Sequence, residues 1–191
     1  MEYVTDFADQ AVMLPLAATV ALALALSGWW RGCGAWVLCV VAVLGTIAVL
    51  KYVFYACSNV LGSSGISSPS GHTAAAAMIM GGATVMLLRE RVPGWVLAAL
   101  PVALAVVFAI SRIVVHAHTV PEVIVGGIIG LIGTACLYGV AGPRPAGRRW
   151  PAVLAAALVL VGLHGLRLHA ETTLHNFALF TWLPLPAICR I

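Results

Sequence analysis

A few polar residues lie at the ends of apolar stretches in this chain, where their side chains could do chemistry. Ionisable side chains near a membrane are costly unless they face a cavity or a partner, so each of them predicts a function. A lysine, an arginine and two histidines together indicate an anion site, and phosphate is the usual anion. The set comprises Lys51, Pro69, Ser70, Gly71, His72, Thr73, Ser111, Arg112, His118, Thr119 and Glu122.

The tetrapeptide Pro69-Ser70-Gly71-His72 precedes an alanine run and predicts the start of a helix. Proline is tolerated in the first helical turn, so we expect Pro69 there. Ser70 and Gly71 would then leave backbone N–H groups for an anion. His72 would lie at the rim and could hand a proton to a leaving oxygen. The alternative is a simple Ser-Pro helix start.

The pair Ser111-Arg112 follows an apolar run, Val102 to Ile110. An arginine at that depth predicts a cavity or a partner, and its guanidinium matches phosphate oxygens in a bidentate manner. The alternative is an arginine whose head group reaches the membrane interface.

His118 and Glu122 are four residues apart, which places them on one helix face. A carboxylate beside an imidazole fixes the tautomer and the ring direction, as required for a histidine nucleophile or base. The alternative is an interfacial ion pair. His116 lies two residues from His118, so on a helix it would point elsewhere.

Lys51 is the only lysine of the chain and follows a long apolar segment. Alone it would be interpreted as an interface anchor. Beside the other groups it is predicted to be a phosphate ligand.

The elements that must position these residues are apolar helices. Of the 191 residues, 62% are hydrophobic and only 8% are charged, which is typical of an integral membrane protein. We expect one all-α membrane domain over residues 1–191, with six transmembrane helices in a bundle. Their predicted ranges are 11–28, 35–56, 72–88, 95–115, 120–141 and 151–167.

Arginine counting predicts the orientation of the bundle. If the helices alternate, the breaks at 27–34, 89–94 and 142–150 share one face, and positive charge marks the cytoplasmic side. Both termini and the polar helix ends would then face the periplasm of a bacterial inner membrane. The arginines of these breaks are Arg31, Arg89, Arg91, Arg144, Arg148 and Arg149.

These residues resemble the motifs of the type 2 phosphatidic acid phosphatase superfamily, which includes the vanadium haloperoxidases. The family's second motif, Pro-Ser-Gly-His, is complete at Pro69–His72. The third, Ser-Arg, five residues, His, three residues, Asp, matches from Ser111 to Glu122, with Glu in place of Asp. The first, Lys, six residues, Arg-Pro, retains Lys51 but has Ser58-Asn59 at its end.

The resemblance implies a mechanism without metal or cofactor. His118 would attack phosphorus and form a phosphohistidine, Glu122 would orient it, and His72 would protonate the leaving oxygen. The phosphoryl oxygens would be held by Lys51, Arg112, Ser70 and Gly71, with Ser111 as an additional contact. The sequence has no carboxylate cluster suited to a metal.

The missing arginine of the first motif removes a bidentate phosphate ligand. Asn59 could replace it with a neutral donor, or Arg167, at the outer end of the last helix, could reach in.

The resemblance therefore implies a membrane phosphatase acting on a lipid phosphate or pyrophosphate, with undecaprenyl pyrophosphate favoured. Two alternatives remain open: a lipid phosphotransferase with the same site, and a non-catalytic lipid-phosphate binder or transporter. A purely structural membrane protein would leave Arg112 and Glu122 unexplained. The partners are the lipid substrate and the bilayer, no nucleic acid is expected, and the oligomeric state is open.

Two further features lie near the predicted outer face. Cys57 and Cys189 could form a disulfide that pins the C-terminal tail over the site, although two free thiols are the simpler interpretation. The glycines of residues 126–133 are interpreted as helix-packing positions.

Overall fold

The computed structural model describes residues 2–57, 68–143, 150–168, 172–173 and 176, and every regular element within them is a helix. The elements are α1 (Glu2–Asp6), α2 (Gln10–Leu26), α3 (Trp30–Ala56), α5 (Gly71–Ala75), the π-helical turn η2 (Ala76–Met80), α6 (Gly81–Leu88), α7 (Gly94–Val114), α8 (Val120–Val140) and α9 (Trp150–Gly162).

All six predicted apolar stretches form helices. By length and composition, four of them can cross a membrane, namely Trp30–Tyr55, Gly71–Leu88, Gly94–Val114 and Val120–Val140. Two shorter apolar helices cover Gln10–Leu26 and Pro151–Gly162. The chain is therefore a membrane-embedded protein whose described part is all-helical, while the number of six spans stays a prediction.

The last helix is shorter than predicted. The sequence suggested an end at residue 167, but α9 ends at Gly162, and Gly165 has a φ of +87°. Only glycine adopts that backbone conformation without a steric penalty, so the two glycines end the helix early.

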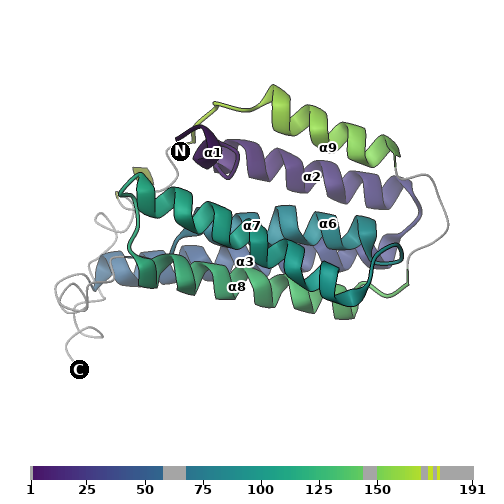
Figure 1. Cartoon of the computed structure of the whole chain (residues 1–191), viewed down its shortest axis with the longest axis horizontal. Helices are drawn as coiled ribbons and strands as arrows, with labels where there is room; N and C mark the ends of the chain where they lie inside the picture. The colour runs from purple at the N-terminus through teal and green to yellow at the C-terminus, as the bar shows by residue number, and fades with distance from the viewer. Residues whose placement is uncertain (1, 58–67, 144–149, 169–171, 174–175, 177–191) are drawn as a thin grey trace.

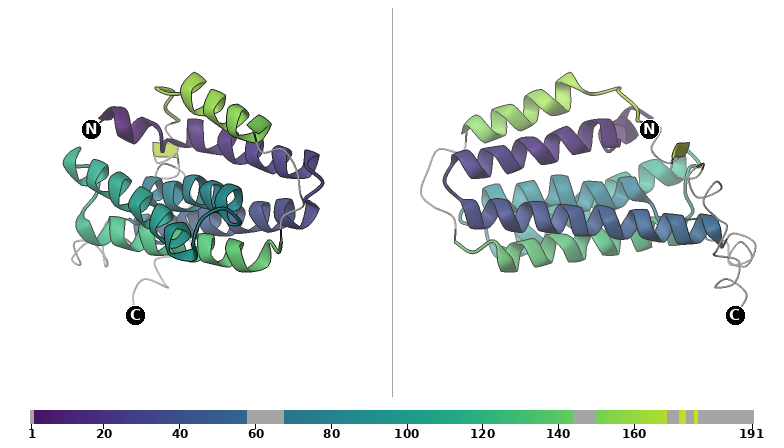
Figure 2. Two further views of the ribbon diagram at one scale, coloured as in Figure 1. Left: turned by 45° about the vertical axis from the view of Figure 1, so that its right-hand side comes forward. Right: turned by 180° about the vertical axis from the view of Figure 1, so that it is seen from behind.

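The segment from α5 through α6 lies at the centre of the bundle. It packs against α7 and α8, and α3 also contacts α5, η2 and α8 (Figures 1 and 2). The helices α2 and α9 lie side by side along one flank, and α2 joins them to α3. Ala74 to Ile79 are almost completely buried, as expected for a helix enclosed by others.

Glycines on α8 allow that helix to approach the central segment closely. A Cβ atom at Gly126 would overlap the carbonyl oxygen of Ser70, and one at Gly130 would lie 2.5 Å from the carbonyl oxygen of Ala74. Small residues at such contacts let two backbones meet, as is common in membranes. The packing role predicted for these glycines agrees with the contacts.

The two ends of the bundle differ in chemistry. The end of α3, the start of α5, the end of α7 and the start of α8 meet at one end, together with α1 (Figure 1). At the other end, the guanidinium of Arg89 lies 4.9 Å from the ring centre of Tyr138, and Arg31 Nε donates a hydrogen bond to the carbonyl oxygen of Val140 at 3.0 Å.

The glycine contact at Gly126 generates a stability prediction. Gly126→Ala is expected to destabilise the protein by about 1–3 kcal/mol, because overpacking must push α8 away from Ser70. The matched control is Gly139→Ala on the same helix, where a Cβ atom meets nothing within 4 Å. Thermal unfolding in detergent should show a lower midpoint for Gly126→Ala alone. Equal midpoints would contradict the close contact.

Candidate functional site

The carboxylate of Glu122 joins three segments at one end of the bundle. Its Oε2 atom accepts hydrogen bonds from His118 Nδ1 at 2.8 Å and from the backbone N–H of Thr119 at 3.0 Å. Its Oε1 atom accepts one from the backbone N–H of Ser68 at 3.0 Å. The side chains of His118 and Glu122 are only 5% and 3% exposed, so this pair is buried within the protein.

The turn between α7 and α8 sets the position of His118. The N–H of Ala117 donates to the carbonyl of Arg112, and the N–H of His116 donates to that of Ile113. This is the hydrogen-bond pattern of a Schellman motif, with His116 in the left-handed conformation at φ 55°. The chain therefore reverses tightly and brings His118 back beside the end of α7.

The start of α5 differs in detail from the prediction. Pro69 lies before the helix, because Ser70 is the N-cap residue and Gly71 is the first helical residue. The Ser70 hydroxyl accepts a hydrogen bond from the N–H of Thr73, as serine commonly does at this position. The Ser70 N–H donates to the carbonyl of Glu122 at 3.0 Å, so it is not available to an anion.

The basic residues approach the same helix ends. Lys51 is buried at 4% exposure, and its Cε atom lies 3.5 Å from an ideal Cβ position on Gly71. The ammonium stem thus runs along the first residue of α5. Arg112 lies in the last turn of α7, and its carbonyl accepts the N–H groups of Ala117 and His118.

His72, in the first turn of α5, faces the N-terminal segment. Its Nε2 atom lies 3.9 Å from Oδ2 of Asp9, the N-cap residue of α2. The sequence did not predict this neighbour, because a carboxylate that begins an apolar helix is sufficiently explained by capping.

The remaining predicted residues have other surroundings. Ser111 is fully buried, and its hydroxyl donates to the carbonyl of Phe108 and accepts a hydrogen bond from Thr5. The guanidinium of Arg167 donates two hydrogen bonds to the carboxylate of Asp6, at 2.8 and 3.2 Å. Asn59 lies outside the described residues. The phosphate-binding roles of these residues stay predictions.

A cavity of about 580 Å³ opens beside two of the three catalytic candidates, and His72 does not line it. His118, Glu122 and Ser68 line it, together with His116 and Tyr55 from the end of α3. His116 thus faces the same cavity as His118, although a helical geometry would have separated them. Tyr55 was missed by sequence reasoning; its hydroxyl lies 3.4 Å from Ser68 Oγ.

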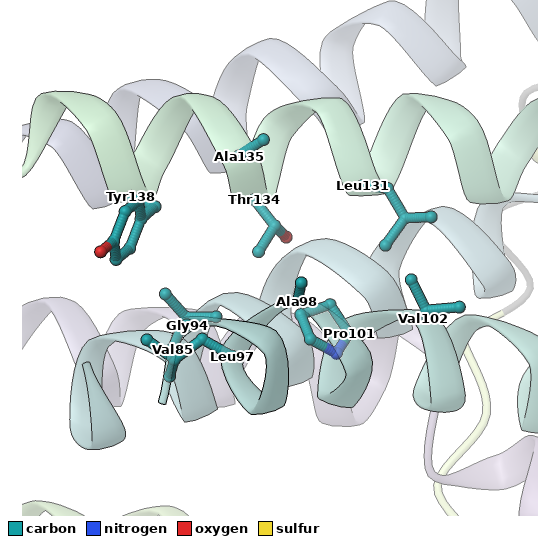
Figure 3. A pocket seen from close by; sticks show the side chains of 10 residues that line it. All are labelled: Val85, Gly94, Leu97, Ala98, Pro101, Val102, Leu131, Thr134, Ala135 and Tyr138. Carbon is teal, nitrogen blue, oxygen red and sulfur yellow. The ribbon is translucent and has the colours of Figure 1, made fainter. Parts of the chain in front are cut away.

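A second cavity, of about 380 Å³, lies between α6, α7 and α8, nearer the other end of α7 and α8 (Figure 3). Its lining is apolar apart from Thr134 and Tyr138, so it offers no group for phosphate chemistry. Within the described ranges, no three His, Cys, Asp or Glu side chains form a group that could hold a metal ion.

The cysteines correct one prediction. Cys57, at the C-terminal end of α3, is disulfide-bonded, so the simpler interpretation of a free thiol is wrong for this residue. Cys33, Cys39 and Cys136 are free. Cys189 lies outside the described residues.

The comparison with protein families gives one match. A family model described as the PAP2 superfamily matches residues 37–145, which is more than half of the chain. This range contains all three motif regions and excludes α1, α2 and α9. The comparisons with curated proteins and with solved structures give no match.

The three hydrogen bonds of Glu122 generate a prediction about stability. Glu122→Gln keeps the shape of the side chain but turns an amide N–H toward a backbone or ring N–H. We expect a loss of about 1–3 kcal/mol, because a buried donor loses its acceptor. Glu90→Gln, at an exposed position, is the control and should change stability by less than about 0.5 kcal/mol. Equal unfolding midpoints of the two variants in detergent would refute the stabilising role of the hydrogen bonds that Glu122 accepts.

Proposed function

Since the chain belongs to the PAP2 superfamily, we propose that it is an integral membrane phosphatase that removes phosphate from a lipid phosphate or pyrophosphate. The family supports a phosphatase-type activity on phosphorylated substrates. The observation that carries the finer proposal is the buried His118–Glu122 pair at 2.8 Å, joined through Glu122 to the segment that begins α5.

In the first half-reaction, His118 attacks the phosphorus. Because its Nδ1–H donates to the carboxylate of Glu122, the lone pair of the ring lies on Nε2. The new N–P bond forms as the P–O bond to the leaving group breaks. His72 gives its proton to the leaving oxygen, so the lipid departs as an alcohol or as a lower phosphate.

In the second half-reaction, a water molecule attacks the phosphohistidine. His72, now neutral, accepts the proton of the water, and the N–P bond breaks to release inorganic phosphate and restore His118. The cycle uses the two histidines in alternating roles and draws no step from a metal.

The phosphoryl oxygens need cationic and N–H partners. We assign Lys51, Arg112 and the N–H of Gly71 to this task, and Ser70 through its hydroxyl, because its own N–H is bound to Glu122. Ser111 lies adjacent, and Asn59 or Arg167 would take the place of the missing motif arginine. The position of the Lys51 stem against Gly71 supports this assignment, because it brings a cation to a helix start, where anions are favoured.

The membrane orientation follows from charge. The end that carries Arg31 and Arg89 would face the cytoplasm, and the site end would face the periplasm of a bacterial inner membrane, with six spans and both termini outside. A site at the periplasmic end of the bundle would bind the head group of a lipid in the outer leaflet. Undecaprenyl pyrophosphate is the favoured substrate within this class.

The activity is tested by phosphate release from detergent-purified protein with EDTA present, using a panel of lipid phosphates and pyrophosphates. We expect His118→Ala to lower release from the preferred substrate by at least about 10³-fold, because the nucleophile is removed. Gly139→Ala serves as the control variant, which is expressed and purified in the same way and should retain phosphate release.

Phosphate release that survives His118→Ala would contradict the mechanism. Transfer of phosphate to an added lipid alcohol, with little free phosphate, would instead identify a phosphotransferase with the same site. Binding of a panel member without turnover would identify a binder or transporter.

The orientation is tested with introduced thiols. Val120→Cys lies at the site end and Gly94→Cys at the other, and both positions are exposed. A membrane-impermeant maleimide should label Val120→Cys, but not Gly94→Cys, in bacteria whose outer membrane alone has been permeabilised, with the wild-type chain giving the background. The reverse pattern would place the site in the cytoplasm.

A further inference from the structure

The N-terminal segment, residues 2–9, lies outside the family-matched range yet contacts two of the three motif regions. Thr5 Oγ1 donates to Ser111 Oγ at 3.2 Å, next to Arg112, and Asp9 faces His72. The remainder of the site comes from α3, α5, α7 and α8. Asp9 is therefore a carboxylate near the site that comes from a segment outside the family-matched range.

The two oxygens of Asp9 have different partners. Oδ1 accepts hydrogen bonds from the N–H of Ala11 and of Leu168, each at 2.9 Å. Oδ2 lies 3.9 Å from His72 Nε2. The side chains of Asp9 and His72 are only 12% and 13% exposed, so bulk water screens this pair weakly.

Capping alone does not require the second oxygen. An N-cap needs one acceptor, and asparagine or serine caps a helix as well as aspartate does. A carboxylate also costs more to bury than an amide or a hydroxyl. The negative charge on Oδ2 is therefore the part of Asp9 that the helix start leaves unexplained. Within the described part of the chain, Oδ2 forms an ion pair with His72.

We propose that Asp9 is a positioning residue for His72, which fixes the imidazole ring and stabilises its protonated form ahead of transfer to the leaving oxygen. This inference rests on the proposed phosphatase function. A carboxylate closer than about 4–6 Å favours the charged form of a neighbouring base. The Asp9–His72 separation of 3.9 Å is shorter than that limit.

The geometry also assigns the two ring nitrogens of His72. Because Nε2 is the ring nitrogen that lies 3.9 Å from Asp9, we assign the proton that passes to the leaving oxygen to Nδ1. As His118 forms its N–P bond, the P–O bond breaks, the oxygen takes the Nδ1 proton, and His72 becomes neutral with Nε2–H retained. Water attack in the second half-reaction returns the proton to Nδ1, so the proton balance closes.

Several contacts hold Asp9 in place. Arg167 is bound to Asp6, and His164 stacks between Tyr3 and Phe7 with ring centres 4.1 and 4.2 Å apart. The chain that follows α9 is thereby fastened to the N-terminal segment, and Leu168 contacts Asp9 itself. The carboxylate thus faces His72 from a backbone restrained at both sides.

The test compares two leaving groups. A dodecyl alkoxide must be protonated as it leaves, whereas p-nitrophenolate leaves without that help. In the detergent-purified full chain, Asp9→Asn should lower kcat/KM for dodecyl phosphate about tenfold and that for p-nitrophenyl phosphate less than about twofold. The ratio kcat/KM reports the half-reaction in which the leaving group departs.

Two further variants keep the test decisive. Asp9→Ser also keeps a capping residue and should change the two kcat/KM values as Asp9→Asn does. If gel filtration or thermal unfolding shows that one of the two variants folds poorly, the other one provides the test. Glu90→Gln removes an exposed carboxylate at the other end of the bundle and should leave the ratio of the two kcat/KM values unchanged. In a His72→Ala background, Asp9→Asn should have less than a twofold further effect, because it acts through His72.

Equal losses for both substrates, no loss, or additive losses with His72→Ala would overturn the role of Asp9 while the phosphatase function stands. If the wild-type protein releases phosphate from none of these substrates and from no member of the lipid panel in a His118-dependent manner, the proposed function falls, and this inference falls with it.

Discussion

The site depends on one buried carboxylate that accepts three N–H groups. Burying a charged oxygen pair is expensive, and the donors from His118, Thr119 and Ser68 offset that cost. Glu122 occupies a position where the family pattern has aspartate. Its extra methylene is compatible with one oxygen serving the histidine and the helix start while the other reaches the segment before α5. The same side chain thereby fixes the nucleophile and the relative placement of two helices.

That placement also requires a close approach of backbones. The carbonyl of Ser70 lies where a side chain at Gly126 would be, and the N–H of Ser70 bonds to the carbonyl of Glu122 one turn earlier. Hydrogen bonds at the first turn of α8 and glycine contacts in the following turns both hold α8 against the segment that begins α5. In a bilayer, where lipid tails compete equally for apolar surface, such close packing and hydrogen bonding are what hold helices together.

Sequence reasoning located the helices and the catalytic candidates for identifiable reasons. The apolar runs are long enough to specify helices, and the spacing from Arg112 to Glu122 is local, so the pairing of His118 with Glu122 was predictable. The αL conformation of His116 was hidden because glycine, its usual occupant, is absent. The contacts of Thr5 with Ser111 and of Asp9 with His72 join distant residues, and no periodicity in the sequence reveals them.

The fastening of the two chain ends has a consequence for biogenesis. Arg167 meets Asp6 across 161 positions, and Leu168 meets Asp9 across 159. During synthesis, residues 2–9 emerge well before α9 exists. They therefore lack their contacts with Arg167 and Leu168 while every intervening helix enters the membrane. The His118–Glu122 pair can form as soon as α8 is made, but the contacts around Asp9 form only after α9 and Leu168 have been made. The site would thus form in a fixed order. The nucleophile His118 would be positioned first, and the restraint of Asp9 beside the proton donor His72 would come last.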